Sequence, residues 1–233
     1  MPLNLRPKSF RLIIIRMAMV LGMLAVAACD NGRAIPVTST VIVGTKAIFI
    51  RDRETYTFEV TDVSEKFVTT EVSNLDGDLI SRETFYRGLY QTSQFGLGRR
   101  QWELEFDENQ LESLFPLKQG NKTSIAGTLN IIDTGEAYEY VTSFSVLGEK
   151  TVDLADGLHK VMVIEIESVY LFPNKTISRR EVMYYDPKMS MILKKITWAD
   201  HKKHYWRVKS VEIPGGPAQV TPTRQRRSGT VMI

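Results

Sequence analysis

The fold class is decided by one stretch of the chain, YEYVTSFSV at residues 138–146. Aromatic and β-branched side chains occupy every second position from 138 to 146, and a glutamate and two serines lie among the positions between them. Alternation with a period of two is typical of a β-strand that buries one face. Residues 56–60 and 102–106 show the same alternation. The sequence therefore predicts an all-β protein built from half-buried strands.

Strand signals recur along the chain, with turn residues between them. About ten segments predict strands, namely 46–51, 56–60, 66–73, 102–106, 123–132, 138–146, 160–170, 177–185, 191–198 and 204–213. Asp76-Gly77 suits a tight hairpin turn, because glycine tolerates a positive φ. One short helix is expected at 108–115, before Pro116. We expect a curved antiparallel sheet that forms a closed or half-open barrel or a sandwich of about ten strands, with little helix.

Composition places the chain among ordinary globular proteins, with 43% hydrophobic and 24% charged residues. The formal net charge of +3 arises at the two ends. Residues 1–28 hold four cations and residues 214–233 hold three, and neither segment contains an acid. Between them, 23 basic residues stand against 27 acidic residues, a net charge of −4. Nucleic-acid binding requires a basic patch on the folded part of a protein, so this balance argues against a nucleic-acid partner.

The N-terminal segment has the three parts of a secretory signal. Four cations within residues 1–16 precede an uncharged run, MAMVLGMLAV at 17–26, and small residues follow it. This order is typical of an export signal. The run is shorter than the roughly 20 apolar residues that a membrane-spanning helix needs, and Arg16 prevents its extension toward the N-terminus. We take Met1 as the start, because a start at Met17 would remove the cations.

The end of this segment, Val26-Ala27-Ala28-Cys29, resembles the lipobox of bacterial lipoproteins. The resemblance implies cleavage between Ala28 and Cys29, a diacylglycerol thioether on the Cys29 sulfur, and acylation of the new amino terminus. Cys29 is the only cysteine of the chain, so no disulfide competes for it. The alternative is an ordinary export signal with an incidental cysteine. Two or three acyl chains anchor a protein stably where a single chain does not.

The residue after the cysteine bears on which membrane holds the protein. Asp30 resembles the inner-membrane retention signal of enterobacterial lipoproteins, which favours the inner over the outer membrane. The predicted order is a lipoprotein signal peptide at 1–28, an acylated N-terminus and linker at 29–40, a β-rich periplasmic domain at 41–213, and a disordered tail at 214–233.

Further segments resemble a group of secreted bacterial β-rich proteins of largely unknown function. They are LFPLKQG at 114–120, VDLADG at 152–157, and YYDP at 184–187 followed by ILKK at 192–195. In that group each such element precedes a strand of a curved antiparallel sheet. The resemblance supplies no catalytic residue, and residues 189–191 stand where the group often has glycine.

No residue pattern in the sequence predicts a metal site. His201 and His204 are three residues apart near the start of a strand, where that spacing directs them to opposite faces. We interpret both, together with His159, as solvated surface residues. The polar segment 74–78 alternates like a calcium loop but lacks the glycine and the glutamate of that loop, so a hairpin turn explains it.

Paired carboxylates occur twice in predicted strands, at Glu103 and Glu105 and at Glu165 and Glu167. Because each pair alternates with apolar residues, we interpret both as solvated faces of the sheet rather than as catalytic acids. Residues 160–170 differ, since they carry bulky side chains on both faces. This pattern predicts either a second packed layer or an apolar groove.

These observations favour a membrane-anchored periplasmic lipoprotein that acts without catalysis, as a binding or envelope-assembly accessory module. No cofactor and no catalytic residue is expected. The expected partners are the membrane, through the lipid anchor, and envelope proteins or an apolar ligand. Two alternatives remain: a carrier or acceptor of lipid or another apolar ligand, and a hydrolase that acts on envelope polymers.

Overall fold

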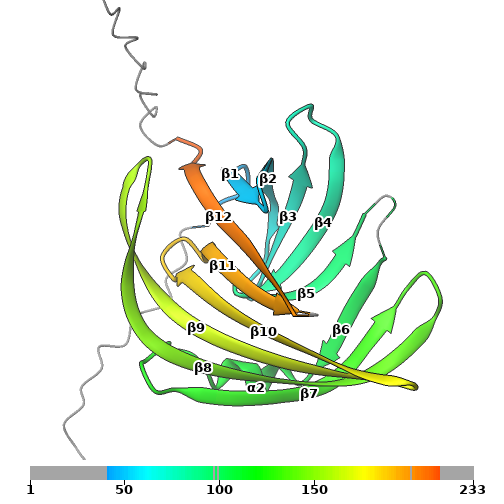
Figure 1. Ribbon diagram of the computed structural model, residues 1–233. Coiled ribbons are helices and arrows are strands. Elements are labelled where there is room, and N and C mark those ends of the chain that lie inside the picture. The colour runs from blue at the N-terminus through cyan, green and yellow to red at the C-terminus, as the bar shows by residue number, and fades with distance from the viewer. Residues whose placement is uncertain (1–40, 97, 99, 200, 216–233) are drawn as a thin grey trace, which may run out of the picture. The chain divides into compact units, whose positions relative to one another are not determined.

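The computed structural model describes residues 41–96, 98, 100–199 and 201–215. The chain divides into two compact units, Met1–Arg33 and Ala34–Ile233, and every described residue belongs to the second. The predicted signal peptide, the linker at 29–40 and the tail beyond Gly215 lie outside the described residues. The described part forms one antiparallel barrel (Figure 1).

Twelve strands run through the described residues, and turns or short loops join them. In chain order they are β1 (Lys46–Arg51), β2 (Glu54–Val63), β3 (Phe67–Ser73), β4 (Leu79–Tyr86), β5 (Tyr90–Phe95), β6 (Trp102–Phe106), β7 (Lys122–Ile131), β8 (Glu136–Leu154), β9 (Gly157–Phe172), β10 (Lys175–Asp186), β11 (Met191–Ala199) and β12 (Lys202–Glu212).

Each strand pairs with its neighbours in sequence, and β12 pairs with β1 to close the barrel. The closing register joins Lys46 to Glu212 and Arg51 to Trp206. Closure leaves none of the described strands at an open edge, and open edges are where sheets pair with other chains. The predicted all-β class is confirmed, and the closed barrel is the form that the chain adopts.

The prediction of about ten strands misses two, β4 and β5. Their buried positions include small hydroxyl residues, Ser81 on β4 and Thr92 and Ser93 on β5. The Thr92 hydroxyl group donates to the backbone carbonyl of Thr84, so the sheet itself satisfies this buried group. Because these residues look polar in the sequence, alternation of apolar and polar positions cannot reveal the two strands.

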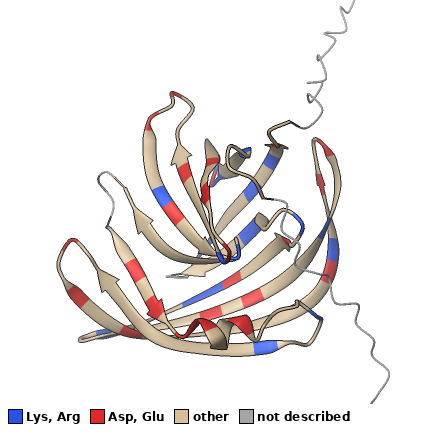
Figure 2. Cartoon of the chain, turned by 180° about the vertical axis from the view of Figure 1, so that it is seen from behind, with Lys and Arg blue, Asp and Glu red and all other residues tan. Residues whose placement is uncertain are grey.

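One helix, α2 (Glu108–Glu112), follows β6 and holds two turns together at one end of the barrel. Glu108 pairs with Lys66 of the β2–β3 turn at 3.0 Å. Glu112 accepts a hydrogen bond from Arg87 Nε of the β4–β5 turn at 2.9 Å. The two glutamates are red on the helix in Figure 2. The helix prediction is confirmed, with a shorter extent than 108–115.

The helix also seals the core at this end of the barrel. Leu111 of the helix and Leu114 and Leu117 of the following loop are fully buried. They belong to one cluster with Tyr86 and Phe144, which are buried residues of β4 and β8. We call this the closed end of the barrel, because helix and loop cover it.

β8 and β9 extend past their pairing with β10 as a long hairpin, residues 150–161, which we call the arm. A bulge between Val146 and Gly148 redirects the strand just before the arm begins. At its tip, the backbone N–H of Ala155 donates to the carbonyl of Lys209 on β12 at 3.2 Å. Figure 1 shows the hairpin curving round toward the end of β12. The arm therefore adds a second layer over part of the barrel.

The arm explains the bulky residues on both faces of β9. Val161 and Ile164 have side chains on opposite faces, and both are fully buried. Ile164 belongs to the cluster beneath α2, whereas Val161 packs in a second cluster with Met189 of the β10–β11 turn and Leu193. Of the two predicted alternatives, a second packed layer forms over residues 161–164, which are buried on both faces, whereas further along the strand Ser168 and Tyr170 line a cavity.

His159 lies on the arm and contacts the β10–β11 turn. Its Nδ1 is 3.1 Å from an Asp186 carboxylate oxygen, and its Nε2 is 3.2 Å from one of Asp156. Its side chain is 16% exposed. The interpretation of His159 as a solvated surface residue is wrong, because the arm places it between Asp156, three residues before it, and Asp186 at the end of β10.

Candidate functional site

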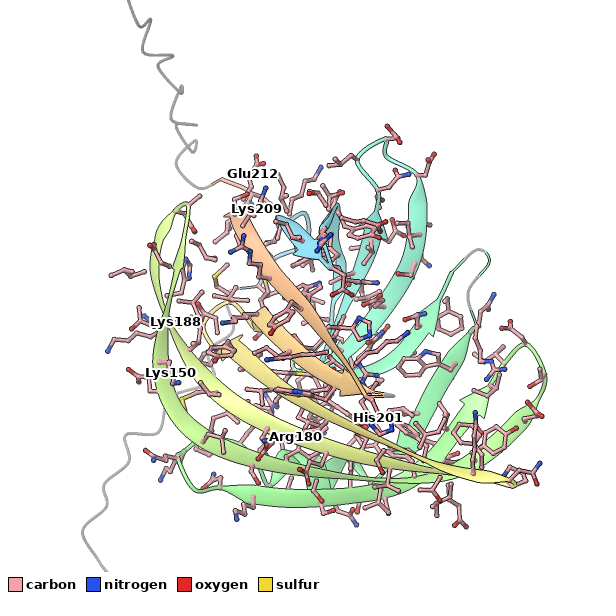
Figure 3. All side chains as sticks on the ribbon, viewed as in Figure 1. Lys150, Arg180, Lys188, His201, Lys209 and Glu212 are labelled. Atoms are coloured by element: carbon pink, nitrogen blue, oxygen red, sulfur yellow. The ribbon has the colours of Figure 1, made fainter. Side chains whose placement is uncertain are left out.

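The barrel encloses a cavity of about 570 Å³, to which eleven of the twelve described strands contribute lining residues. At the closed end, Gly88 and Ser190 form its floor, and both are buried. At the other end, Arg100 and His204 line it, and both are exposed. The cavity is thus a lumen that opens at the end opposite α2, which we call the open end. Figure 3 labels His201 at this end of β12 and Glu212 at the other.

Apolar side chains form most of the lumen wall. Phe49 stacks on Tyr56 with ring centroids 5.4 Å apart and lies 5.1 Å from the indole ring of Trp206. On β3, two strands from β1, the lining residues are smaller, namely Val68, Thr70 and Val72. Side chains of this size do not fill the centre of a twelve-stranded barrel, whose interior widens with the number of strands. The strand count and the short side chains together leave the space open.

A cluster of charges interrupts the apolar wall on β10 and β11. One oxygen of Glu181 accepts from Arg179 Nη2 at 2.7 Å and from the Thr197 hydroxyl group at 3.0 Å, and it lies 3.4 Å from Lys195 Nζ. Glu181 is 7% exposed. Burial acts to raise the pKa of Glu181, but Lys195 and Arg179 outweigh burial and hold that pKa below its usual range.

The cluster leaves one positive charge in excess, because two cations surround one carboxylate. Arg179 Nε is buried and has no hydrogen-bond partner among the described residues. All four residues of the cluster line the lumen. A buried donor without a partner is costly in a folded protein. The cluster therefore offers a hydrogen-bond donor and a net positive charge to whatever occupies the lumen.

Hydroxyl groups form a chain in the lumen wall on the side of β5, β8 and β9. The Tyr90 and Thr142 hydroxyl groups are 3.2 Å apart, and those of Thr142 and Ser168 are 2.9 Å apart. Burial raises the pKa of Tyr90 well above its usual range, so its phenol stays neutral. Tyr90 and Ser168 both line the lumen. This chain satisfies buried polar groups without adding charge.

At the open end, the β1–β2 turn is tied to β12. His204 Nδ1 lies 2.7 Å from one Asp52 oxygen, and the backbone N–H of Tyr205 donates to the other at 3.0 Å. These hydrogen bonds hold the pKa of Asp52 below its usual range. His204 is exposed as predicted, but no sequence signal links it to Asp52, because the two lie at opposite ends of the domain sequence.

The sequence-predicted sites have different outcomes. Ala28, Cys29 and Asp30 lie outside the described residues. Glu103 and Glu105 are exposed, which confirms the solvated face. The segment 74–78 is a hairpin turn, as predicted: the Asn74 side-chain oxygen accepts from two backbone N–H groups within it.

No group of three or more histidine, cysteine, aspartate or glutamate side chains in residues 41–215, apart from the undescribed positions, could hold a metal ion. No helix in the same part of the chain is both long and apolar enough to cross a membrane.

The fold and the lumen together define a closed antiparallel β-barrel with an accessible interior. The same fold occurs in the hypothetical lipoprotein YmcC from Escherichia coli, with a TM-score of 0.50 and 11% identity over 82% of this chain and 95% of that chain. The likeness shows the shared fold. No family model matches the chain, and no curated protein matches its sequence.

Two further solved structures are similar at lower scores. A protein from Bacteroides fragilis, described as exported and YmcC-like in fold, has a TM-score of 0.46 and 11% identity, with coverage of 75% of this chain and 98% of that chain. A protein from Parabacteroides distasonis, described as a lipoprotein, has a TM-score of 0.43 and 8% identity, with coverage of 78% and 100%.

Proposed function

We propose that this chain is a bacterial lipoprotein, anchored through Cys29 with the barrel in the periplasm, that binds an apolar or amphipathic ligand in its lumen without catalysis. The observation that carries the proposal is the lumen of about 570 Å³, open at one end. That volume lies within the range of small-molecule sites, about 300–1,000 Å³. Asp30 favours the inner membrane as the place of anchoring.

The lumen wall supports a ligand that combines an apolar body with a polar or anionic group. Phe58, Tyr170 and Trp206 offer apolar surface, while Arg179 on β10 and Lys195 on β11 offer donors. An apolar ligand gains roughly 25 cal/mol for each Å² of surface removed from water. An anionic group on the ligand would balance the excess positive charge beside Glu181.

A hydrolase is less well supported by the same residues. Glu181, the most buried acid of the lumen, is ionised and held by three donors, so it is a poor general acid. His204 is bonded to Asp52 but to no hydroxyl group among the described residues, so no activated nucleophile is formed there. Binding is therefore the activity that we propose.

Filling the lumen is expected to prevent ligand binding. Thr70→Phe places a ring inside the lumen, whereas Thr69→Phe changes the neighbouring residue, whose side chain points out of the barrel. Native mass spectrometry of protein purified from its host should show bound ligand in the parent and in Thr69→Phe. The fraction of protein with bound ligand should be at least about tenfold lower in Thr70→Phe. Equal occupancy in both variants, or an empty lumen in the parent, would contradict the proposal.

The lipid anchor has its own test. Cells fed a clickable fatty acid should label the parent protein, and Cys29→Ala should carry no label, because the lipobox resemblance assigns the acylated sulfur to this residue. Label that persists in the variant would show that the lipid is attached elsewhere or that the cysteine is incidental.

A further inference from the structure

The outer surface of β10, β11 and β12 carries cations and apolar side chains in register. Three rows of paired residues cross these strands: Arg180, Trp198 and Lys203; Val182, Ile196 and Tyr205; and Tyr184, Lys194 and Arg207, with Ile50 of β1 beside Arg207. Paired residues share a face of the sheet. The intervening row of Met183, Lys195 and Trp206 lines the lumen, so the ten residues lie on the outer side of the sheet, and Tyr205, near the open end, also borders the lumen. We call them the basic-aromatic face.

Contacts within the face confirm that its cations and rings are neighbours. The distances from cation to ring centroid are 5.1 Å for Arg180 and Trp198, 5.4 Å for Lys203 and Trp198, 5.0 Å for Lys203 and Tyr205, and 4.7 Å for Lys194 and Tyr184. Tyr205 is nevertheless 51% exposed. Such contacts arrange cations around rings without neutralising their charge.

Most of the cations on this face have no acidic partner. Arg180, at the border with β9, pairs with Glu165 and Glu167. Lys194, Lys203 and Arg207 form no ion pair with any described residue. None of the ten residues of the face is acidic. The face is therefore positively charged on a domain whose net charge is negative.

The three unpaired cations surround a depression of about 400 Å³. Arg53 of the β1–β2 turn also lines it, and its backbone has a φ of 92°. The backbone of a residue other than glycine is strained at such a φ. Asp52 is the one acid among the lining residues, and its oxygens are already bonded to His204 and Tyr205. The depression thus presents four cations and no free carboxylate.

We propose that the basic-aromatic face docks on the surface of an anionic phospholipid bilayer, with lipid phosphate groups in the depression. Each cation held close to an anionic bilayer raises the binding constant about fivefold. Tyrosine and tryptophan favour the bilayer interface, because one end of each ring is apolar and the other is polar. The aliphatic residues Val182, Ile196 and Ile50 suit contact with lipid, whereas a nucleic acid would leave them without a partner.

The position of β1 is compatible with docking beside an anchored terminus. β1 borders the face through the pair of Ile50 and Arg207. Residues 29–40 can span at most about 40 Å when fully extended, which limits how far the barrel can stand from an acylated Cys29. The inference uses the envelope location of the proposed function but does not depend on what the lumen binds.

Vesicle binding tests the proposal. The chain from residue 29 onward contains the whole barrel, and Cys29→Ala removes any contribution from acyl chains. We expect this protein to bind vesicles of phosphatidylglycerol and phosphatidylcholine in equal parts, and to bind pure phosphatidylcholine vesicles at least about tenfold more weakly. Added salt should weaken binding, because it screens the charges.

Matched substitutions assign the binding to the face. In the same background, Lys203→Gln with Arg207→Gln should lower the partition coefficient about 25-fold, the product of two fivefold losses. Lys122→Gln with Lys150→Gln removes two exposed lysines from β7 and β8 and should leave binding within about twofold. Figure 3 labels Lys150 on the arm side of the barrel, away from this face.

Three outcomes would overturn the proposal: equal binding by both double variants, equal binding to neutral vesicles, or complete displacement by soluble glycerophosphoglycerol. The last result would assign the depression to a free phosphate ester. Unchanged thermal unfolding of both double variants serves as the folding control. Ligand occupancy of the lumen in the variant Lys203→Gln with Arg207→Gln separates the two proposals. If this occupancy is unchanged, the docking proposal can fail while the lumen proposal stands.

Discussion

Replacing Glu181 with alanine is expected to destabilise the barrel by about 3–5 kcal/mol. The substitution leaves two buried or half-buried cations without the carboxylate that they share. Arg179 and Lys195 both direct their charge at one Glu181 oxygen, and the Arg179 Nε already lacks a partner. The loss exceeds that of an exposed ion pair, which contributes about 0–1 kcal/mol. Chemical denaturation at neutral pH measures the difference directly.

Two comparisons isolate the cause of this loss. Glu103→Ala removes an exposed glutamate from β6 and should change stability by less than about 0.5 kcal/mol. Glu181→Leu combined with Arg179→Met and Lys195→Met should recover most of the loss, because an apolar cluster replaces the charges. A cost below about 1 kcal/mol for Glu181→Ala would show that water in the lumen already screens the cluster.

The contribution of this charge cluster to the stability of the barrel depends on pH. The pKa of Glu181 is lower in the folded state than in the unfolded chain, so its carboxylate contributes stability that is complete above the unfolded pKa. That contribution is lost as the pH falls through the folded value. The difference between the parent and Glu181→Ala should therefore shrink below about pH 4.

Gly88→Ala is expected to destabilise the barrel by about 2–5 kcal/mol through strain and steric overlap. Gly88 has a φ of 66°, which an alanine adopts only with strain. Its added Cβ would lie 1.7 Å from the backbone oxygen of Ser190, so the two turns that form the lumen floor would have to separate. The Tyr185 hydroxyl group donates to the Arg87 carbonyl and holds these turns together.

The control for this substitution is another glycine with a positive φ. Gly77 has a φ of 90°, and nothing lies within 4 Å of a Cβ added there. Gly77→Ala should cost only about 1–2 kcal/mol, the price of the backbone conformation alone. Thermal unfolding of both variants gives the comparison. Similar losses of stability at the two positions would mean that the lumen floor rearranges at little cost. The close approach of the two turns would then contribute little to the stability of the barrel.

Much of the barrel could be predicted because half-buried strands leave a period of two in the sequence. The strand at 138–146 is an example, and the structure confirms it; the short helix after β6, predicted from helical spacing before Pro116, is confirmed as well. β4 and β5 escaped prediction because hydroxyl residues occupy their buried positions. The choice of a closed barrel over a sandwich depends on the pairing of β12 with β1, which no local pattern encodes.

The site was harder to predict than the fold, because it depends on which face each residue occupies after strands pair. Arg179 and Arg180 are adjacent in sequence, yet one lines the lumen and the other lies on the outer surface. The overall negative charge of residues 29–213 concealed the basic-aromatic face, since a net charge says nothing about where cations gather. The contact of Asp52 with His204 likewise arises only when the barrel closes.

The closure of β1 against β12 bears on the route by which a ligand would reach the lumen. Lys46 and Glu212 are paired at the closed end, which α2 covers. The chain therefore enters β1 and leaves β12 at the end opposite the opening. A barrel lying on its outer β10–β12 surface would hold its axis parallel to the membrane, with the mouth facing sideways. Molecules would enter sideways from the aqueous compartment or from a neighbouring protein, and would not rise straight out of the lipid beneath.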